Sequence, residues 1–461
     1  MGKEVLTMYF NDLSTEPFFT LRLINGTDEY NTNYTDYVLD ENFIKAVVER
    51  AKMSPLTLFK YTCKEYREGH NKVVNTPRTV LSRSNGTPAL SISPVLADNR
   101  IANNFFNQLV EQKSSLLLAR DYSIIIENQA VQEAYNDNRI NIDKALMKLA
   151  EDAIVYGTSY GYCYYQDGTF KVDALNPLEV IPIWEDKISK KLAGLIRVYK
   201  VNKFINNVFK DYKEIEVYTK ERIDRYHYTD NDTLEYFESE KFTVEFPVFS
   251  ISYNNGESLL KNLKPLIDNY DRTLSTLANT IHDAPNSIKV IKGYSGADKD
   301  AFIKNLAEYR TAFIDEDGGL ESLETPLAVV ETNEHLKTLK QNIFQLGKGV
   351  DIEADSLGNA SGAAIRYRYS ALTADVEKFS KEMQEAVKVI VSILADFHST
   401  YTGGVEVVFN MDNSLLESAV IEDIKNSVGI ISNRTLLEQH PWVKDVDDEL
   451  SRINAEATPS I

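Results

Sequence analysis

The sequence predicts an α+β fold that is mainly helical and elongated. Two long segments carry apolar residues at steps of three and four, the spacing of one helix face; they run from Leu259 to Ile281 and from Leu372 to Phe397. Between residues 156 and 253, short β-branched and aromatic runs alternate with polar turns, a pattern typical of strands. Because no Gly or Pro interrupts residues 363–402, the second helix could reach ~55–60 Å at ~1.5 Å per residue.

The composition excludes several classes of protein. The 461 residues carry 50 Lys and Arg against 69 Asp and Glu, a net charge of −19, so bulk charge cannot hold nucleic acid. A hydrophobic share of 43% is enough to bury a core. The two cysteines, Cys63 and Cys163, are too few for a disulfide framework or a multi-cysteine zinc site, which fits a reducing compartment. The sequence shows neither a secretion signal nor ~20 consecutive apolar residues, so no membrane contact is expected.

The first part of the chain is expected to be irregular and then helical. Residues 1–100 show no sustained periodicity and are expected to be peripheral and rich in loops. Apolar residues at helical spacing predict a helix from Asn99 and a second from Ile142 to Tyr156. Glycines and alternating aromatics in residues 157–168 predict a β-hairpin with an Asp-Gly turn.

A strand-rich module follows and leads into the first long helix. Its strands are expected at 180–184, 195–199, 215–218, 225–228 and 247–253. Residues 285–331 look like a small inserted α/β unit. Within it, strands are expected at 287–291, 312–314 and 328–330, and a helix at 297–310. A helix at 334–348, a glycine-bounded acidic loop, the second long helix and a strand at 405–409 complete the order.

No residue pattern in the sequence points to catalysis or to a cofactor. A nucleotide-binding loop would need Gly-Lys-Ser/Thr after its glycines, and a hydrolase elbow would need Gly-x-Ser-x-Gly; the sequence has neither. The six histidines lack the spacing that metal ligation or proton transfer needs. Cys163 lies in an aromatic strand, where packing is its expected role. We therefore expect a protein that is not an enzyme and that binds no cofactor or metal.

Six phrases of the sequence stand in the order typical of one protein family. They are Asn99–Lys113, Tyr156–Tyr162, Asn176–Ile183, Leu266–Asn279, Asn359–Arg366 and Ile431–Leu437. With these phrases the chain resembles the portal proteins of tailed bacteriophages, of the type common in long-tailed phages of Gram-positive bacteria. The resemblance extends from about residue 95 to the C-terminus.

The resemblance implies a function in genome packaging. Such proteins form a ring, usually a dodecamer, at one capsid vertex, and double-stranded DNA is packaged and ejected through the channel of the ring. The partners implied are the terminase large subunit, a head–tail adaptor protein, and the major capsid and scaffolding proteins. The locations implied are the virion and, during assembly, the host cytoplasm. Another self-assembling virion protein, such as a component of the capsid shell, remains the alternative.

The resemblance also divides the chain into regions. These would be a wing at 1–257, of which 1–100 is peripheral; stem helices at 258–284 and 332–348; a clip at 285–331; a tunnel loop at 349–361; a long wing helix and strand at 362–415; and a crown at 416–461. The crown segment is expected to be helical.

The tunnel loop of the family projects into the channel toward DNA. In this chain its candidate DNA-channel residues are Asp351, Glu353, Asp355, Ser356 and Asn359. Each phosphate that a cation neutralises strengthens sequence-independent binding, so a channel that moves DNA must not grip it. Carboxylates repeated around a constriction would supply repulsion that keeps DNA mobile.

Cationic and apolar residues near the loop complete the candidate sites. Lys340, Lys348 and Arg366 are candidates for transient contacts with DNA phosphates; the alternative is that they are solvated helix residues or form ion pairs between subunits. Slim stem helices must bury an apolar stripe on a neighbour. The candidate interface residues of the first stem helix are Leu263, Tyr270, Leu274, Leu277 and Ile281. The seam from Leu372 to Phe397 is expected to be core.

Overall fold

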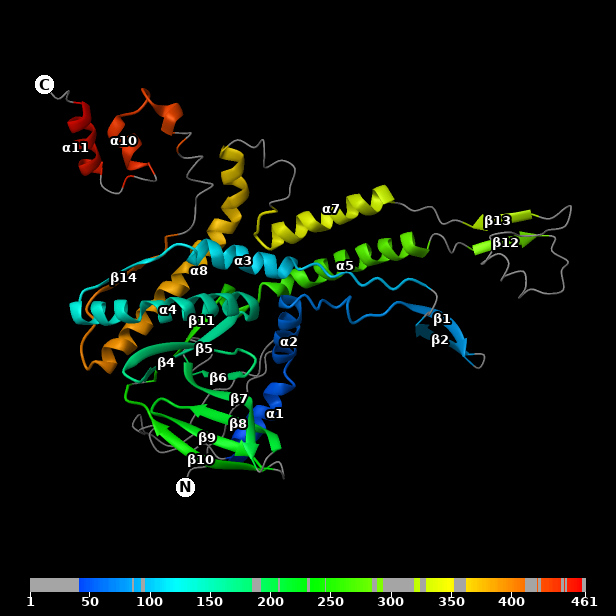
Figure 1. Ribbon diagram of the computed structural model, residues 1–461, viewed down its shortest axis with the longest axis horizontal. Helices are drawn as coiled ribbons and strands as arrows, with labels where there is room; N and C mark the ends of the chain where they lie inside the picture. Colours follow the sequence, from blue (N-terminus) through cyan, green and yellow to red (C-terminus); the bar gives the residue numbers. More distant parts are fainter. Residues whose placement is uncertain are drawn as a thin grey trace, which may run out of the picture. The chain divides into compact units, whose positions relative to one another are not determined.

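The computed structural model describes most of the chain as two compact units (Figure 1). The described residues are 41–84, 87–92, 96–184, 192–205, 208–229, 233–244, 246–283, 288–292, 319–323, 329–351, 362–410, 421, 424–440, 443 and 446–457. The large unit contains the described residues of 1–68, 104–263 and 344–461, and the small unit contains those of 69–103 and 264–343.

Three helices form the centre of the large unit: α3 (Phe105–Leu118), α4 (Gln129–Tyr156) and α8 (Gly362–Phe397). They pack on one another. The seven apolar seam residues of α8 from Leu372 to Leu394 are each 3% exposed or less, which confirms the predicted core. Although α8 is long, neither it nor any other helix in the described residues is apolar enough to cross a membrane.

A three-stranded antiparallel sheet, ordered β11-β4-β5, packs on α4. β4 (Thr158–Gln166) and β5 (Thr169–Leu175) form the predicted hairpin, and β11 (Val248–Ser252) pairs with the other edge of β4. Asp167 and Gly168 have φ angles of 54° and 75°, as a two-residue I′ turn requires. The Asp-Gly signal in the sequence therefore predicted both the hairpin and its turn.

A five-stranded antiparallel sheet, ordered β10-β9-β8-β7-β6, forms the other strand-rich part of the large unit. Its strands are β6 (Val180–Trp184), β7 (Leu192–Ile205), β8 (Val208–Tyr218), β9 (Arg222–Tyr228) and β10 (Leu234–Lys241). The expected runs coincide with β6 and with parts of β7, β8 and β9. β10 was not expected because every residue after Leu234 is exposed, so the strand shows no apolar alternation.

One face of the five-stranded sheet is covered by α1 (Glu41–Lys52), which lies beside β10 and packs its apolar side chains with residues of all five strands (Figure 1). Ile44 and Val48 of this helix are at most 1% exposed and belong to one apolar cluster with Ile196 and Ile215 of the sheet. Burial of these branched side chains stabilises the packing by roughly 1.5–3 kcal/mol each. The helix and the sheet thus share one core.

The first hundred residues are not uniformly loop-rich, and that expectation is wrong for α1 and for α2 (Pro55–Arg67). Ser54 caps α2, because its Oγ accepts a hydrogen bond from the amide of Thr57 at 3.1 Å. Proline directly after a serine is a standard helix start. This local signal was overlooked because both helices are short and have no sustained apolar repeat.

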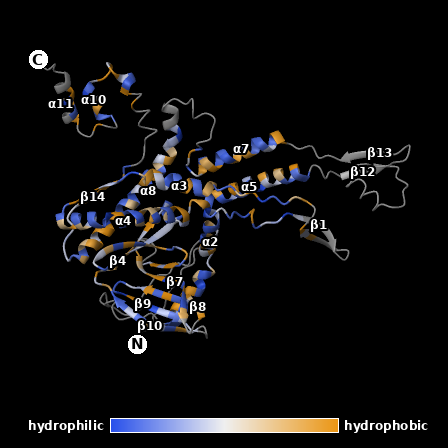
Figure 2. Ribbon diagram, viewed as in Figure 1, coloured by the Kyte–Doolittle hydropathy of each residue, from blue (hydrophilic) through white to orange (hydrophobic). Residues whose placement is uncertain are grey.

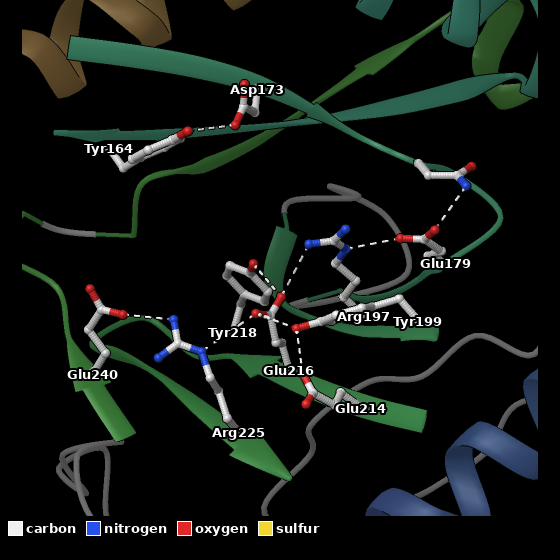
Figure 3. A network of polar contacts seen from close by, with 11 residues as sticks. Tyr164, Asp173, Glu179, Arg197, Tyr199, Glu214, Glu216, Tyr218, Arg225 and Glu240 are labelled. Atoms are coloured by element: carbon white, nitrogen blue, oxygen red, sulfur yellow. Dashed lines mark hydrogen bonds and ion pairs between the residues drawn. The ribbon is translucent and has the colours of Figure 1, made fainter. Parts of the chain in front are cut away.

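Glu216 of β8 is the centre of a polar network on the sheet face opposite α1 (Figure 3). Its carboxylate accepts hydrogen bonds from the hydroxyls of Tyr199 at 3.1 Å and Tyr218 at 2.9 Å. Arg197 and Arg225 are its ion-pair partners, and Arg225 also bonds two carboxylates of β10. Burial, followed by the charge of Glu216, raises the pKa of Tyr218. These charges are satisfied within the sheet, so the network has an architectural role.

The two cysteines, Cys63 of α2 and Cys163 of β4, are buried free thiols. Cys63 Sγ lies 3.3 Å from Ser258 Oγ. Burial raises the pKa of Cys63 to about 12 and also raises the pKa of Cys163. Because the thiolate is the reactive form, both residues serve in packing.

The small unit contains most of α5 (Leu260–Asp283) and of α7 (Val329–Leu346), together with two two-stranded antiparallel sheets. These sheets are β1 (Thr79–Ser84) with β2 (Thr87–Ile92), and β12 (Ile288–Lys292) with β13 (Gly319–Leu323). Hydrophobic and hydrophilic residues alternate along α5 and α7, as in amphipathic helices (Figure 2).

The expected elements of the inserted α/β segment are found in part. The strand expected at 287–291 is β12. The strand expected at 328–330 is wrong, because Val329 begins α7 and Val330, at 73% exposed, is not packed in a sheet. The helix expected at 297–310 and the strand expected at 312–314 lie outside the described residues.

Residues 97–103 lie along α5 and are held there by a ladder of hydrogen bonds. In each rung a backbone amide donates to a helix side chain: Ala97 N to Asp283 Oδ1 (2.8 Å), Asn99 N to Asn279 Oδ1 (2.6 Å), Ile101 N to Ser275 Oγ (2.9 Å) and Asn103 N to Asp271 Oδ1 (3.0 Å). Two extended residues advance ~6.6 Å and four helical residues ~6.0 Å, so the rungs stay in register. The helix expected from Asn99 therefore begins only at Phe105.

Asp271 is the most deeply buried acceptor of this ladder, at 0% exposed. Its two oxygens accept hydrogen bonds from the backbone and side-chain amides of Asn103 and from the side-chain amide of Asn71. Burial raises the pKa of the Asp271 carboxyl, and the three hydrogen bonds offset that rise only in part. The role of the Asp271 carboxylate is to accept these three hydrogen bonds.

Replacing Asp271 with alanine should leave the buried side-chain amide of Asn71 and the half-buried amides of Asn103 without this acceptor. We expect the free energy of unfolding to fall by about 2–4 kcal/mol, since each buried unsatisfied donor costs about 1–3 kcal/mol. Urea denaturation followed by circular dichroism measures the change. Thr276→Ala, on an exposed position of the same helix, is the control and should change stability by less than about 0.5 kcal/mol. Equal losses in both variants would contradict the ladder.

Candidate functional site: the root of the loop between α7 and α8

The tunnel loop expected at 349–361 is described only at its root. Residues 352–361 lie outside the described residues, and with them four of the candidate channel residues: Glu353, Asp355, Ser356 and Asn359. The fifth, Asp351, is half-buried at the end of the described root. The geometry of residues 347–351 therefore defines how the loop leaves α7.

The chain turns sharply after α7 and presses against α3. Lys348 adopts a left-handed φ of 50°, and the amide of Gly349 donates to the carbonyl of Phe344 at 2.9 Å, which closes the helix end. A Cβ at Gly349 would lie 2.1 Å from Leu109 Cδ2 and 2.9 Å from Gln112 Oε1. Only glycine fits this close approach of the loop root to α3.

Gln112 of α3 holds the next residue by both of its backbone groups. Its Nε2 donates to the carbonyl of Val350 at 2.7 Å, and its Oε1 accepts from the amide of Val350 at 3.0 Å. Val350 is 5% exposed, so these backbone groups have exchanged water for the glutamine amide. The Gln112 side chain thereby satisfies the amide and the carbonyl of Val350, as the backbone of a neighbouring strand would.

Asp375 of α8 ties the loop root to three other segments. One oxygen accepts from Lys113 Nζ at 2.7 Å and from the Tyr253 hydroxyl at 2.6 Å, and the other accepts from Lys348 Nζ at 2.6 Å. The side chains of Lys113 and Asp375 are 1% and 5% exposed, whereas that of Lys348 is 51% exposed. The buried Lys113–Asp375 pair, joined by the solvent-facing Lys348, thus anchors the root of the loop.

The electrostatics of this cluster are dominated by burial and by the two ammonium groups. Burial alone would raise the pKa of Asp375, but the lysines and the Tyr253 hydroxyl outweigh it, so the pKa of this carboxyl is lowered. Burial lowers the pKa of Lys113, and the attraction of Asp375 offsets this only in part. Asp375 is therefore held ionised as the counter-charge of the buried lysine.

The three candidate phosphate contacts lie in different settings. Lys348 is ion-paired with Asp375 within the chain. Lys340 is half-buried on α7 in the small unit, and Arg366 lies on α8 with its side chain outside the described residues. Their contact with DNA stays a prediction.

The candidate interface seam on α5 becomes more exposed along the helix. Leu263 is 1% exposed in the large unit, whereas Tyr270, Leu274 and Leu277 of the small unit are half-buried. Ile281 near the helix end is 52% exposed. An apolar stripe that ends in an exposed isoleucine suits further burial in an assembly.

Sequence reasoning missed the residues that build the root, although it had a signal for two of them. Lys113 lies between apolar positions of α3, and Asp375 interrupts the apolar seam of α8. A single charge on an otherwise apolar helix face indicates a buried ion pair. Gln112 and Tyr253 carried no comparable signal. Within the described part of the chain, no three His, Cys, Asp or Glu residues are grouped so that they could hold a metal ion.

The chain is similar to proteins of one kind. Residues 61–460 match the model of a family described as phage portal protein, SPP1 Gp6-like. The portal protein of Clostridium phage phiCD119 is 27% identical over 386 residues, which cover 76% of this chain and 83% of that protein. The portal protein of Bacillus phage SPP1 is 22% identical over 387 residues, covering 78% and 76%.

Solved structures give a weaker similarity. A chain in the virion of a native gene transfer agent particle has 11% identity and a TM-score of 0.43, covering 72% of this chain and 86% of its own length. A chain in the neck of that native particle, computed with C12 symmetry, has 11% identity and a TM-score of 0.41, covering 72% and 87%.

Exchanging Asp375 for asparagine should remove the counter-charge of Lys113 and lower the free energy of unfolding at neutral pH by about 3–5 kcal/mol. A carboxyl whose pKa is lowered on folding stabilises the fold above its unfolded pKa of ~3.9 and loses this contribution as pH falls through the folded pKa. The difference between wild type and variant should therefore shrink in acid. Urea titrations at neutral and acid pH measure it, with Glu377→Gln, exposed on the same helix, as the control. A difference that does not depend on pH would contradict the ionised state.

Proposed function

This chain belongs to the SPP1 Gp6-like family of phage portal proteins, and from this premise we propose that its copies close into a ring around a channel for double-stranded DNA. The observation that carries the proposal is the match of the family model over residues 61–460. A capsid-shell component, the alternative from the sequence, is set aside because both relatives described above are portal proteins. The dodecameric state remains part of the proposal.

The regions of the proposed subunit follow the elements of the two units. α5 and α7 serve as stem helices, and β12 and β13 belong to the clip at 285–331. The wing combines α1 to β11 with α8 and β14 (Val405–Val408). α10 (Asn433–Glu438) and α11 (Val446–Ala457) belong to the crown. The presence of long helices on both sides of the inserted segment supports this assignment.

DNA passes through the proposed channel because nothing there grips it. The chain is acidic, at −19, and the loop that follows Val350 adds three carboxylates within five residues. Repeated around a ring, these charges repel the phosphates, whereas free lysines would bind them. The ion pair of Lys348 with Asp375 supports a positioning role for this lysine at the loop root. The channel itself needs no catalytic residue.

The energy for DNA movement comes from a partner in this proposal. The terminase large subunit docks at the clip during packaging, and a head–tail adaptor protein takes its place afterwards. The major capsid and scaffolding proteins surround the wing. The subunit is assembled in the host cytoplasm and remains in the virion, at the capsid vertex that a portal protein occupies.

Purified full-length protein should form rings with a central hole in negative-stain images. Leu274→Asp on α5 should reduce ring formation strongly, because a carboxylate in a packed apolar seam is costly to bury. Mass measurement in solution gives the ring fraction, and Thr276→Asp on the same helix is the matched control. If Leu274→Asp forms rings as well as the control does, the seam faces solvent. Wild-type protein that never forms rings would refute the proposed assembly.

Replacing Asp351, Glu353 and Asp355 together with lysine should leave rings intact but slow DNA movement. Three added cations per subunit would attract phosphates that the native loop repels. A packaging assay with purified proheads and terminase measures the rate, and the three corresponding Asn and Gln substitutions separate charge reversal from charge loss. Normal packaging by the lysine variant would remove the loop from the mechanism.

A further inference from the structure

The β7–β8 hairpin extends beyond the rest of its sheet. β6 pairs with β7 only over Leu192–Arg197, and β9 pairs with β8 only over Glu214–Tyr218. Between these ranges, the described residues of the two strands have ladder partners only in each other, although the side chains of Lys203 and Lys213 lie over the rings of Phe237 and Tyr228. We call residues 200–205 and 208–213 the hairpin tip. A two-stranded ribbon of this kind is marginally stable on its own.

The hairpin tip is cationic and apolar on a chain that is acidic overall. It contains four lysines and one aspartate, against a net charge of −19 for the whole chain. Lys203 is ion-paired with Glu214 of the same hairpin, and Lys213 lies over the ring of Tyr228, so Lys200 and Lys210 carry the contact proposed below. Phe204 and Phe209 are 61% and 69% exposed, with ring centroids 4.8 Å apart, and Val208 beside them is 56% exposed. Large apolar side chains gathered in this way indicate an interaction site. A partner for the tip should be acidic and should offer apolar contacts.

Such a surface is present elsewhere on the large unit. Residues 121–143 and 401–410, which include β3 (Ser123–Ile126), the start of α4 and β14, hold six acids and one base. The base, Arg139, is bonded to Asp143 and to the carbonyl of Tyr122. We call these two segments the acidic face.

The acidic face also presents apolar side chains to solvent. Ile140 of α4 is 89% exposed and follows the exposed Glu133 and Asp137 on the same helix side. Ile125 and Val408, on the paired strands β3 and β14, are 64% and 46% exposed. Charge and apolar character therefore both complement the hairpin tip.

We propose that the hairpin tip of one copy docks on the acidic face of the next copy. The inference rests on the proposed ring. Because the two patches lie on different elements of one chain, their contact is heterologous, and heterologous contacts close into rings when the rotation allows. Lys200 and Lys210 pair with carboxylates at the rim while the phenylalanines bury their rings against isoleucine and valine.

DNA is the other polyanion that the lysines could contact, but the exposed phenylalanines beside them favour a protein partner. The backbone of duplex DNA offers phosphates, which attract lysine, and no apolar surface for Phe204 and Phe209. A protein face supplies both kinds of contact. Binding of DNA by the hairpin tip would overturn the proposal.

The first experiment reverses charge on the tip of the full-length chain. Lys200→Glu with Lys210→Glu should raise the protein concentration at which half of the chains are in rings by about tenfold or more, because like charges then face each other. Lys378→Glu with Lys381→Glu, exposed on α8, makes the same change in net charge and should leave this concentration within about twofold. Thermal melting by circular dichroism checks that both variants fold. Equal effects of the two pairs would overturn the contact.

The second experiment tests the partner surface by exchanging charges. Glu133→Lys with Asp137→Lys should weaken ring formation to a similar extent, and the four substitutions together should restore it at least in part, since opposite charges face each other again. Failure of the combined variant to recover would overturn the pairing of these two surfaces.

Two further outcomes separate this inference from the proposed function and from DNA binding. Wild-type chains that form no rings would refute the assembly itself, whereas wild-type rings with unaffected tip variants would refute only this contact. A gel-shift assay with duplex DNA is run on the same variants. If the tip variants lose affinity for DNA while their rings are unchanged, the tip binds DNA and the proposal is wrong.

Discussion

A buried carboxylate that is held ionised constrains the centre of the large unit. Asp375 lies in the apolar seam of α8, and it is tolerated there because Lys113, Lys348 and Tyr253 all point at it. Removing Asp375 would leave the charge of Lys113 buried without its counter-charge. The positions of α3, of the end of β11 and of the root of the loop before α8 all follow from this one group.

In the small unit, too, buried and half-buried side-chain acceptors hold distant segments of the chain together. Aspartates and amides of α5 accept the backbone amides of a segment nearly two hundred residues away in sequence, so acidic side chains replace a partner strand. In the five-stranded sheet of the large unit, the Glu216 carboxylate joins neighbouring strands by bonding arginine and tyrosine side chains. Carboxylates of both units are therefore committed to internal bonds.

Features set by local periodicity could be predicted from the sequence, and features set by distant partners could not. The seam of α8 and the Asp-Gly hairpin follow from spacing and turn chemistry alone. The extended form of residues 99–103 depends on acceptors of α5, more than 160 residues further along the chain, so local spacing wrongly predicted a helix there. The phrases Asn99–Lys113 and Leu266–Asn279, treated as separate signals, are joined by three of the four rungs of the ladder. At the loop root, Lys113 and Asp375 could be recognised in the sequence as single charges on apolar helix faces. That they pair with each other depends on tertiary packing and could not be predicted.

The two buried thiols have a practical consequence. Because Cys63 and Cys163 are shielded and resist ionisation, maleimide reagents at neutral pH should pass them by. A cysteine introduced by mutagenesis on the surface would then be the main reactive position in each subunit. The native chain thus serves as a ready background for attaching one fluorophore or crosslinker per copy and following a moving segment in real time.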